Sequence, residues 1–176
     1  RIVIGRTLRR LGEREPGTES LDRAATILRE TVAMADKAKD PLIWGDIQQT
    51  LGETLVRIGE RGSDPAPLEE SVRAFEEALS VRSPETSPDL WAESQHVLGA
   101  ALATLGAREQ DTVKLERSVR AFEAALTVRK PETEPLDWSN TLSALGASYA
   151  ILGERSADKA LIQQAVDVFR EALTVI

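Results

Sequence analysis

Apolar and polar residues follow one another along the chain with the period of an α-helix. A clear example is residues 64–82, where glutamate and arginine separate apolar residues spaced by three or four positions, which are Leu68, Val72, Phe75 and Leu79. This spacing puts the apolar side chains on one face of a helix. A similar pattern occupies residues 41–58, so the sequence predicts two consecutive helices.

This pair of predicted helices recurs every 47 residues. The step relates the three tryptophans, Trp44, Trp91 and Trp138, and the large residues Leu28, Phe75, Phe122 and Phe169. It also relates two series of glycines, which are Gly5, Gly52, Gly99 and Gly146, and Gly12, Gly59, Gly106 and Gly153. The chain therefore divides into four copies without gaps, over residues 1–40, 41–87, 88–134 and 135–176. Such recurrence is the signature of a helical repeat array.

Each copy carries signals for where its helices start and stop. Asp40 before Pro41 is typical of a helix start, and Ser87-Pro88 and Glu134-Pro135 stand at the same register. We expect the first helix of the second copy to cover residues 41–58. It would end at Gly59 in the left-handed conformation that glycine adopts at helix ends. The second helix is expected to begin at a repeated aspartate, which is Asp64, Asp111 or Asp158.

The other glycine of each copy lies in the middle of the first helix, where glycine costs about 1 kcal/mol relative to alanine. A cost repeated at one register, at Gly52, Gly99 and Gly146, indicates a close approach of the second helix. The position expected to face these glycines is always small, namely Ala24, Ser71, Ser118 or Ala165. The tryptophans are expected in the core between copies.

These residues resemble the tetratricopeptide repeat family. That family has a Leu-Gly pair in its first helix, followed in the second helix by a small, a large and an alanine position. The equivalents in the second copy are Leu51-Gly52, Ser71, Phe75 and Ala78. The resemblance covers the whole chain, with a period of 47 in place of the family's 34 residues. It implies an all-α fold, a right-handed superhelical solenoid of antiparallel helix pairs with about four repeats.

The resemblance also implies a function as a protein–protein interaction scaffold that binds a peptide or helix of a partner protein in a concave groove. First helices would line the groove, and its residues by analogy are Arg6, Arg9, Arg10, Gln49, Glu53, Arg57, His96, Thr104 and Ser143. The three N-terminal arginines would suit an acidic segment of the partner, or they form a solvated helix face. Such scaffolds are often segments of larger signalling or regulatory proteins, of a bacterial type.

The alternative function is self-association through exposed solenoid ends. Ile176 stands where two other copies have Arg82 and Arg129, which is consistent with an apolar end. The chain begins with arginine and its first and last copies are cut, so we expect a piece of a longer array.

Composition narrows the range of functions. The net charge is −7, which argues against nucleic acid as a partner. The chain has no cysteine, which excludes disulfides and thiolate metal sites and fits the cytoplasm. No run reaches the roughly 18 apolar residues of a membrane span, so no membrane contact is expected.

Nothing in the sequence indicates an enzyme, a cofactor or a metal. His96 is the single histidine and has no cysteine to share a metal with. Ser94 lies two positions away on another helix face, which does not suit a Ser-His pair. A repeated arginine, Arg61, Arg108 or Arg155, precedes each repeated aspartate by three residues, and a local ion pair in the loop is expected.

Overall fold

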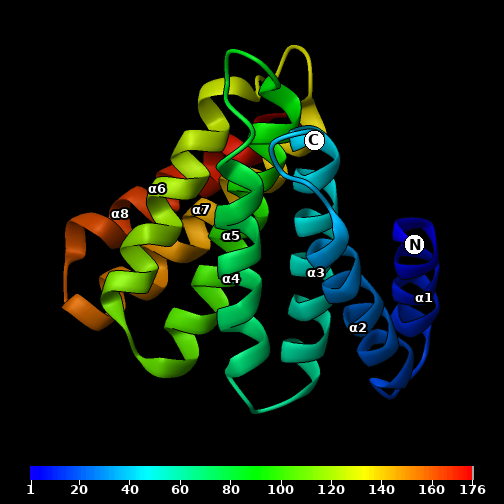
Figure 1. Cartoon of the computed structure of the whole chain (residues 1–176). Helices are drawn as coiled ribbons and strands as arrows, with labels where there is room; N and C mark the ends of the chain where they lie inside the picture. The colour runs from blue at the N-terminus through cyan, green and yellow to red at the C-terminus, as the bar shows by residue number, and fades with distance from the viewer. Residues whose placement is uncertain (176) are drawn as a thin grey trace. The chain divides into compact units, whose positions relative to one another are not determined.

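The computed structural model describes residues 1–175, and within them the chain is all-α, which confirms the predicted fold class (Figure 1). The helices are α1 (Ile2–Arg14), α2 (Glu19–Met34), α3 (Pro41–Arg61), α4 (Ala66–Leu79), α5 (Pro88–Glu109), α6 (Thr112–Val128), α7 (Pro135–Ser156) and α8 (Lys159–Ala172), with a 3₁₀ turn at Leu173–Val175. Ile176, expected at an apolar end, lies outside the described residues.

Consecutive helices pair into hairpins that follow the sequence repeats (Figure 1). Each copy contributes one pair: α1 with α2, α3 with α4, α5 with α6, and α7 with α8. Pro41, Pro88 and Pro135 each occupy the first turn of a first helix, as predicted. The hairpins group into two compact units, Arg1–Ser83 and the part of the chain from Pro84 onward. Each unit holds two hairpins and is described by itself.

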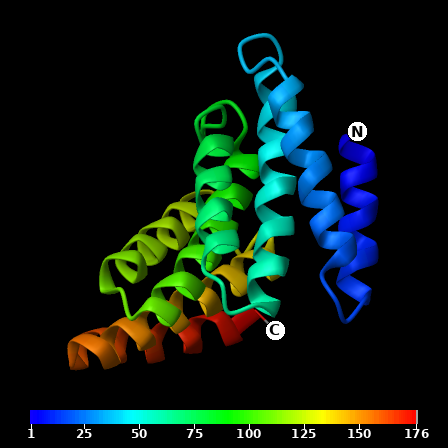
Figure 2. The same cartoon turned by 60° about the horizontal axis from the view of Figure 1, so that its bottom comes forward.

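Within each unit, the second helix of one hairpin packs on the first helix of the next (Figure 2). In the first unit, Leu28 of α2 shares a core with Leu51 and Leu55 of α3. In the second unit, Val119 and Phe122 of α6 pack in one cluster with residues of α7, which are Trp138, Leu142 and Leu145. Leu28 and Phe122 stand at one repeat position and Leu51 and Leu145 at another, so the contacts between hairpins in the two units share these positions.

The three tryptophans are buried to different extents. Trp138 is buried in the core between α6 and α7, as predicted. Trp44 and Trp91 are half-buried. The ammonium group of Lys37 lies 5.1 Å from the centroid of the Trp44 ring, a favourable position for a cation on an aromatic face.

First helices approach one another more closely than second helices do. Within the described residues, the backbone of α1 comes close to that of α3, and the backbone of α5 to that of α7, whereas the backbones of α2 and α4, and of α6 and α8, stay farther apart. Each unit is therefore narrower on the side of its first helices. We call this surface the first-helix face.

The second glycine in the first helix of each copy does not end that helix, so that prediction is wrong. Gly59, Gly106 and Gly153 lie inside α3, α5 and α7, and among residues 1–175 no glycine has a positive φ. The left-handed helix ends are Gln110, with φ 58°, and Ala157, with φ 54°. A Cβ at Gly59 would lie 2.6 Å from Leu68 Cγ of the paired helix. Packing, rather than backbone conformation, therefore requires this glycine.

The mid-helix glycines do mark close approaches, but to large side chains. A Cβ at Gly52 would lie 2.5 Å from Phe75 Cε1. Gly99 stands in the same relation to Phe122, and Gly146 to Phe169. The small residues predicted at this crossing serve the contact between hairpins, since Ser118 Oγ lies 2.9 Å from Ser148 Oγ of α7. A glycine there makes room for an aromatic ring.

The repeated aspartates cap second helices as predicted in the second unit. The Asp111 carboxylate accepts hydrogen bonds from the Val113 and Lys114 amides, and Asp158 does the same for α8. Asp64 accepts from the Ala66 amide at 2.9 Å, one position before the α4 cap. The carboxylate of Asp40 makes no cap hydrogen bond, so that prediction is wrong. Its ψ of 65° departs from the extended conformation that capping requires.

Candidate functional site

The first-helix face of the first unit carries the arginines predicted to bind an acidic partner. Their side chains are engaged within the unit. Arg6 Nε donates to Thr50 Oγ1 at 3.3 Å, and its Nη2 lies 3.8 Å from Asp46 Oδ2. Arg9 is 2.6 Å from the Glu13 carboxylate and 3.3 Å from that of Glu53. Two of the three arginines thus have carboxylate partners.

Arg57 and Glu13 extend this set of ion pairs. Arg57 lies 2.9 Å from Glu60 and 3.8 Å from Glu13, and Arg10 is exposed. Acidic and basic side chains therefore alternate across α1 and α3. The carboxylates of α3 come from the following copy. The first-helix face of this unit is therefore less positively charged than the arginines of residues 1–14 alone would indicate.

Two buried arginines that the sequence pattern does not single out bind side chains of first helices, Arg82 in the first unit and Arg129 in the second. The Arg82 side chain is 1% exposed; its Nη2 donates to Asp46 Oδ1 at 2.7 Å and its Nη1 to Gln49 Oε1 at 3.2 Å. Arg129 stands at the same register and donates to Glu93 Oε2 and, at 2.8 Å, to Thr141 Oγ1. In both units the acid precedes the arginine by 36 residues, a recurrence visible in the sequence. Gln49 is therefore buried in a network, contrary to its predicted place on an open surface.

His96 belongs to the network of the second unit. Its Nδ1 lies 3.1 Å from Thr141 Oγ1. The Thr141 hydroxyl donates its single proton to the Asp137 carbonyl at 2.6 Å and accepts from Arg129. The hydroxyl has only acceptor capacity left for His96, so the Nδ1 atom of the neutral ring carries the proton. The ring meets Phe122 edge-on, with centroids 5.6 Å apart.

Burial, and then the charge of Arg129, lower the pKa of His96 below its ordinary value of 6.5, against the weaker opposing effects of Glu93 and Asp137. Below about pH 6.5 the unfolded chain takes up a proton more readily than the folded one. The free energy of unfolding is therefore expected to fall as the pH drops below this value. The free energies of unfolding of the parent and of His96→Gln, measured by urea melts, should approach each other toward acidic pH. The reason is that only the parent has a histidine whose protonation favours the unfolded chain. A difference between them that stays constant from pH 8 to 5 would contradict this expectation.

The first-helix face of the second unit consists mainly of small side chains. Thr104 is half-buried and its hydroxyl donates to the Ala100 carbonyl at 2.9 Å, within its own helix. Ser143 and Ala147 of α7 are exposed. Next to them lie half-buried residues of α5 and α7, which are Ala100, Ala103, Ala150 and Ile151. This surface offers mainly methyl groups and backbone to a partner.

The repeated arginines reach back to the preceding hairpin and do not pair with the local aspartate. Arg61 Nη1 donates to the Gly17 carbonyl at 2.5 Å, and its Nη2 to the Glu13 carbonyl at 3.4 Å. Arg155 Nη2 donates to the Ala107 carbonyl at 2.6 Å. The predicted loop ion pairs are therefore wrong for these two residues, because the neighbouring helix end offers unpaired carbonyls. Within each unit, these bonds tie the second hairpin to the first.

A bidentate ion pair joins second helices in the first unit. Arg29 Nε and Nη2 donate to the two carboxylate oxygens of Glu70 at 2.7 and 2.6 Å. The hydrogen bonds from Arg29 hold the pKa of Glu70 below its ordinary range. The side chains of Arg29 and Glu70 line a hollow of about 300 Å³ together with Leu51 and Ala74.

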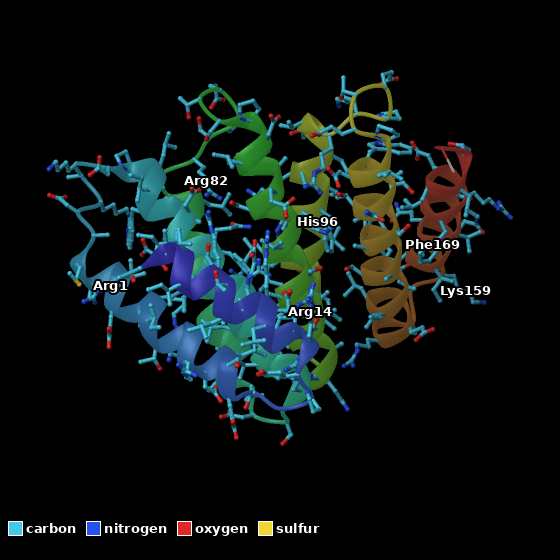
Figure 3. All side chains as sticks on the ribbon, turned by 90° about the vertical axis from the view of Figure 1, so that its right-hand side faces the viewer. Arg1, Arg14, Arg82, His96, Lys159 and Phe169 are labelled. Atoms are coloured by element: carbon cyan, nitrogen blue, oxygen red, sulfur yellow. The ribbon has the colours of Figure 1, made fainter. Side chains whose placement is uncertain are left out.

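The apolar face of α8 is open, unlike the matching face of α6. Phe75 and Phe122 are 0% and 1% exposed, whereas Phe169 is 38% exposed. Figure 3 labels Phe169 on α8. Ile162 and Val166 of α8 are exposed as well, and so is Leu173 of the following 3₁₀ turn. We call this row, with Phe169, the α8 face. The predicted structural role of Phe169 is thus only partly fulfilled, because its side chain stays partly exposed among the described residues.

Within residues 1–175 no group of histidine and carboxylate side chains is placed to hold a metal ion. No helix in this range has the length and apolar character needed to cross a membrane. No family model matches the chain, and no curated protein is significantly similar to it. A solved structure titled "DHF58 filament" is similar in fold, with a TM-score of 0.49 and 16% identity over 99% of this chain and 90% of that chain. A similarity this low transfers no property between the two.

Proposed function

We propose that the chain is a protein–protein interaction scaffold of the tetratricopeptide type, which binds a peptide or helix of a partner on its first-helix face. One observation carries the proposal: within each unit the backbones of the two first helices are in close contact, whereas over residues 1–175 those of the two second helices are not. The first-helix face is thus the inner side of each unit. An inner surface built from consecutive helices suits an elongated ligand.

The chemistry of the two units differs, and this defines the partner segment. In the first unit Arg6 and Arg9 already have carboxylate partners, so an acidic ligand that binds these two arginines would have to displace Asp46, Glu53 or Glu13. The second unit presents small apolar side chains around Ala147. We therefore propose that an apolar stretch of the partner binds to α5 and α7, and that an acidic stretch contributes less.

Selection of binders from a random peptide library tests this proposal. Enriched peptides should carry apolar residues at helical or alternating spacing. Ala147→Arg should weaken their binding about 30-fold or more, since it puts a long charged side chain where a close contact forms. Thr127→Arg, an equally exposed change on α6, serves as the control and should leave binding unchanged. If both variants lose peptide binding equally, or if neither loses it, the peptide does not bind at the first-helix face of the second unit.

Self-association is the second candidate function, and the open apolar face of α8 favours it. Exposed apolar residues in one contiguous row commonly mark a contact with another protein. No residue group described above resembles a catalytic site, so we propose no enzymatic activity. The absence of cysteine fits a cytoplasmic location.

A further inference from the structure

The α8 face matches the exposed residues of α1 through the repeat register. Ile162, Val166, Phe169 and Leu173 stand 47 positions after residues of α6, which are Leu115, Val119, Phe122 and Leu126. Val119 and Phe122 are covered by α7, the first helix of the next hairpin. The helix that covers α8 should therefore have the character of a first helix.

The first helix of the first hairpin, α1, has the complementary face exposed. Its residues Val3 and Ile4 stand at the register of Ala144 and Leu145, which pack in the cluster with α6. Leu11 stands at the register of Leu152, which is buried. Val3, Ile4 and Leu11 are all exposed. Within the residues that the structure describes, α1 and α8 thus carry the two complementary halves of the recurring contact, and both are exposed.

Arg14 supplies a polar contact of the same kind. It stands at the register of Arg61 and Arg155, which donate to backbone carbonyls of the preceding hairpin, and it is exposed at the end of α1 (Figure 3). The Glu13 and Ala107 carbonyls that accept these bonds share one register, and the next position in that series is Glu154. Arg14 of a second copy would therefore donate to the Glu154 carbonyl, next to a carboxylate of favourable charge.

From these matches we propose that the chain associates head to tail, with α1 of one copy covering α8 of another. The inference rests on the self-association function and specifies its geometry. Because the two surfaces differ, the contact is heterologous, and each added copy leaves a free end on both sides. Assemblies larger than a dimer follow.

The ion pair between second helices predicts how the contact can be strengthened. Arg170 stands at the register of Arg29, and Arg23 stands at the register of Glu70. Where Arg29 and Glu70 attract each other, Arg170 of one copy and Arg23 of the next would repel. Arg23→Glu should replace this repulsion with an attraction and tighten association about tenfold at low salt. Arg23→Glu combined with Arg170→Glu should lose that gain.

Sedimentation of the full chain from about 1 μM to about 500 μM, a range that brackets the affinity of a small interface, tests the geometry. The parent mass should rise beyond that of a dimer. Ile4→Asp and Val166→Asp should each remain monomeric, because a buried carboxylate blocks one end. An equimolar mixture of the two variants should form a dimer and nothing larger, since one intact α1 meets one intact α8. Val113→Asp, an exposed change on α6, should associate like the parent.

Two results would overturn the proposal in different ways. A parent that stays monomeric over the whole range would exclude both the geometry and self-association itself. A parent that stops at a dimer, with Ile4→Asp behaving identically, would mean that α8 pairs with α8 of a second copy, so that self-association stands and the head-to-tail contact fails. Circular dichroism of each variant confirms that a lost assembly does not come from a lost fold.

Discussion

Phe122→Ala is expected to lower the free energy of unfolding by about 3–5 kcal/mol. The Phe122 side chain is 1% exposed and packs against His96, Gly99 and the α7 cluster. Its removal leaves a cavity at the contact between two hairpins and within one of them at once. Domains of this size have about 5–15 kcal/mol of total stability, so the loss would be a large fraction.

The matched control is Phe169→Ala, which makes the same chemical change at the same repeat position. Phe169 is 38% exposed, so its removal should cost about 1–2 kcal/mol, in proportion to the smaller buried area. Urea unfolding at a protein concentration low enough to keep the chain monomeric compares the two. Equal losses would mean that the α8 face is covered as completely as the α6 face, contrary to the present account.

Gly52→Leu is expected to cost about 3 kcal/mol, at the upper end for overpacked cores. A Cβ at this position would already lie 2.5 Å from the ring of Phe75, and Phe75 is fully buried. The better helix propensity of leucine returns only about 1 kcal/mol. The same change at Gly99 should cost somewhat less, because the distance to Phe122 there is 2.9 Å.

Gly17→Ala is the control for this substitution, since a Cβ at Gly17 would meet nothing within 4 Å. Its melting temperature should equal that of the parent or exceed it slightly, because alanine restricts the unfolded chain. If Gly52→Leu melts at the parent temperature, the glycine has no packing role and the crossing can open without cost.

Sequence periodicity was sufficient to predict the helices, their pairing and the hairpin boundaries. A step of 47 residues brings every copy into register, and the prolines at 41, 88 and 135 mark the helix starts. The same pattern led to a wrong reason for the glycine at position 59, namely a helix end in place of close packing. Close packing and a left-handed helix end both require glycine, and only the position of Leu68 on the paired helix distinguishes them.

The candidate site was less predictable because its chemistry depends on side chains from different copies. Arg6 and Arg9 form a basic run in the sequence, yet their partners Asp46 and Glu53 lie 40 or more residues later. Arg82 is charged and stands at the end of an amphipathic helix, where exposure is the ordinary expectation. Its burial becomes predictable only when the recurring acid, Asp46 or Glu93, is aligned with it.

Mapping of amide chemical shifts by NMR, with a peptide enriched in the library selection, tests the central claim that the first-helix face binds the partner. We expect the shift changes to cluster on α5 and α7, around residues 96–104 and 143–151, with few changes on α6. Shifts concentrated on α6, or on the uncovered face of α8, would contradict it and assign binding to the second-helix side of the chain.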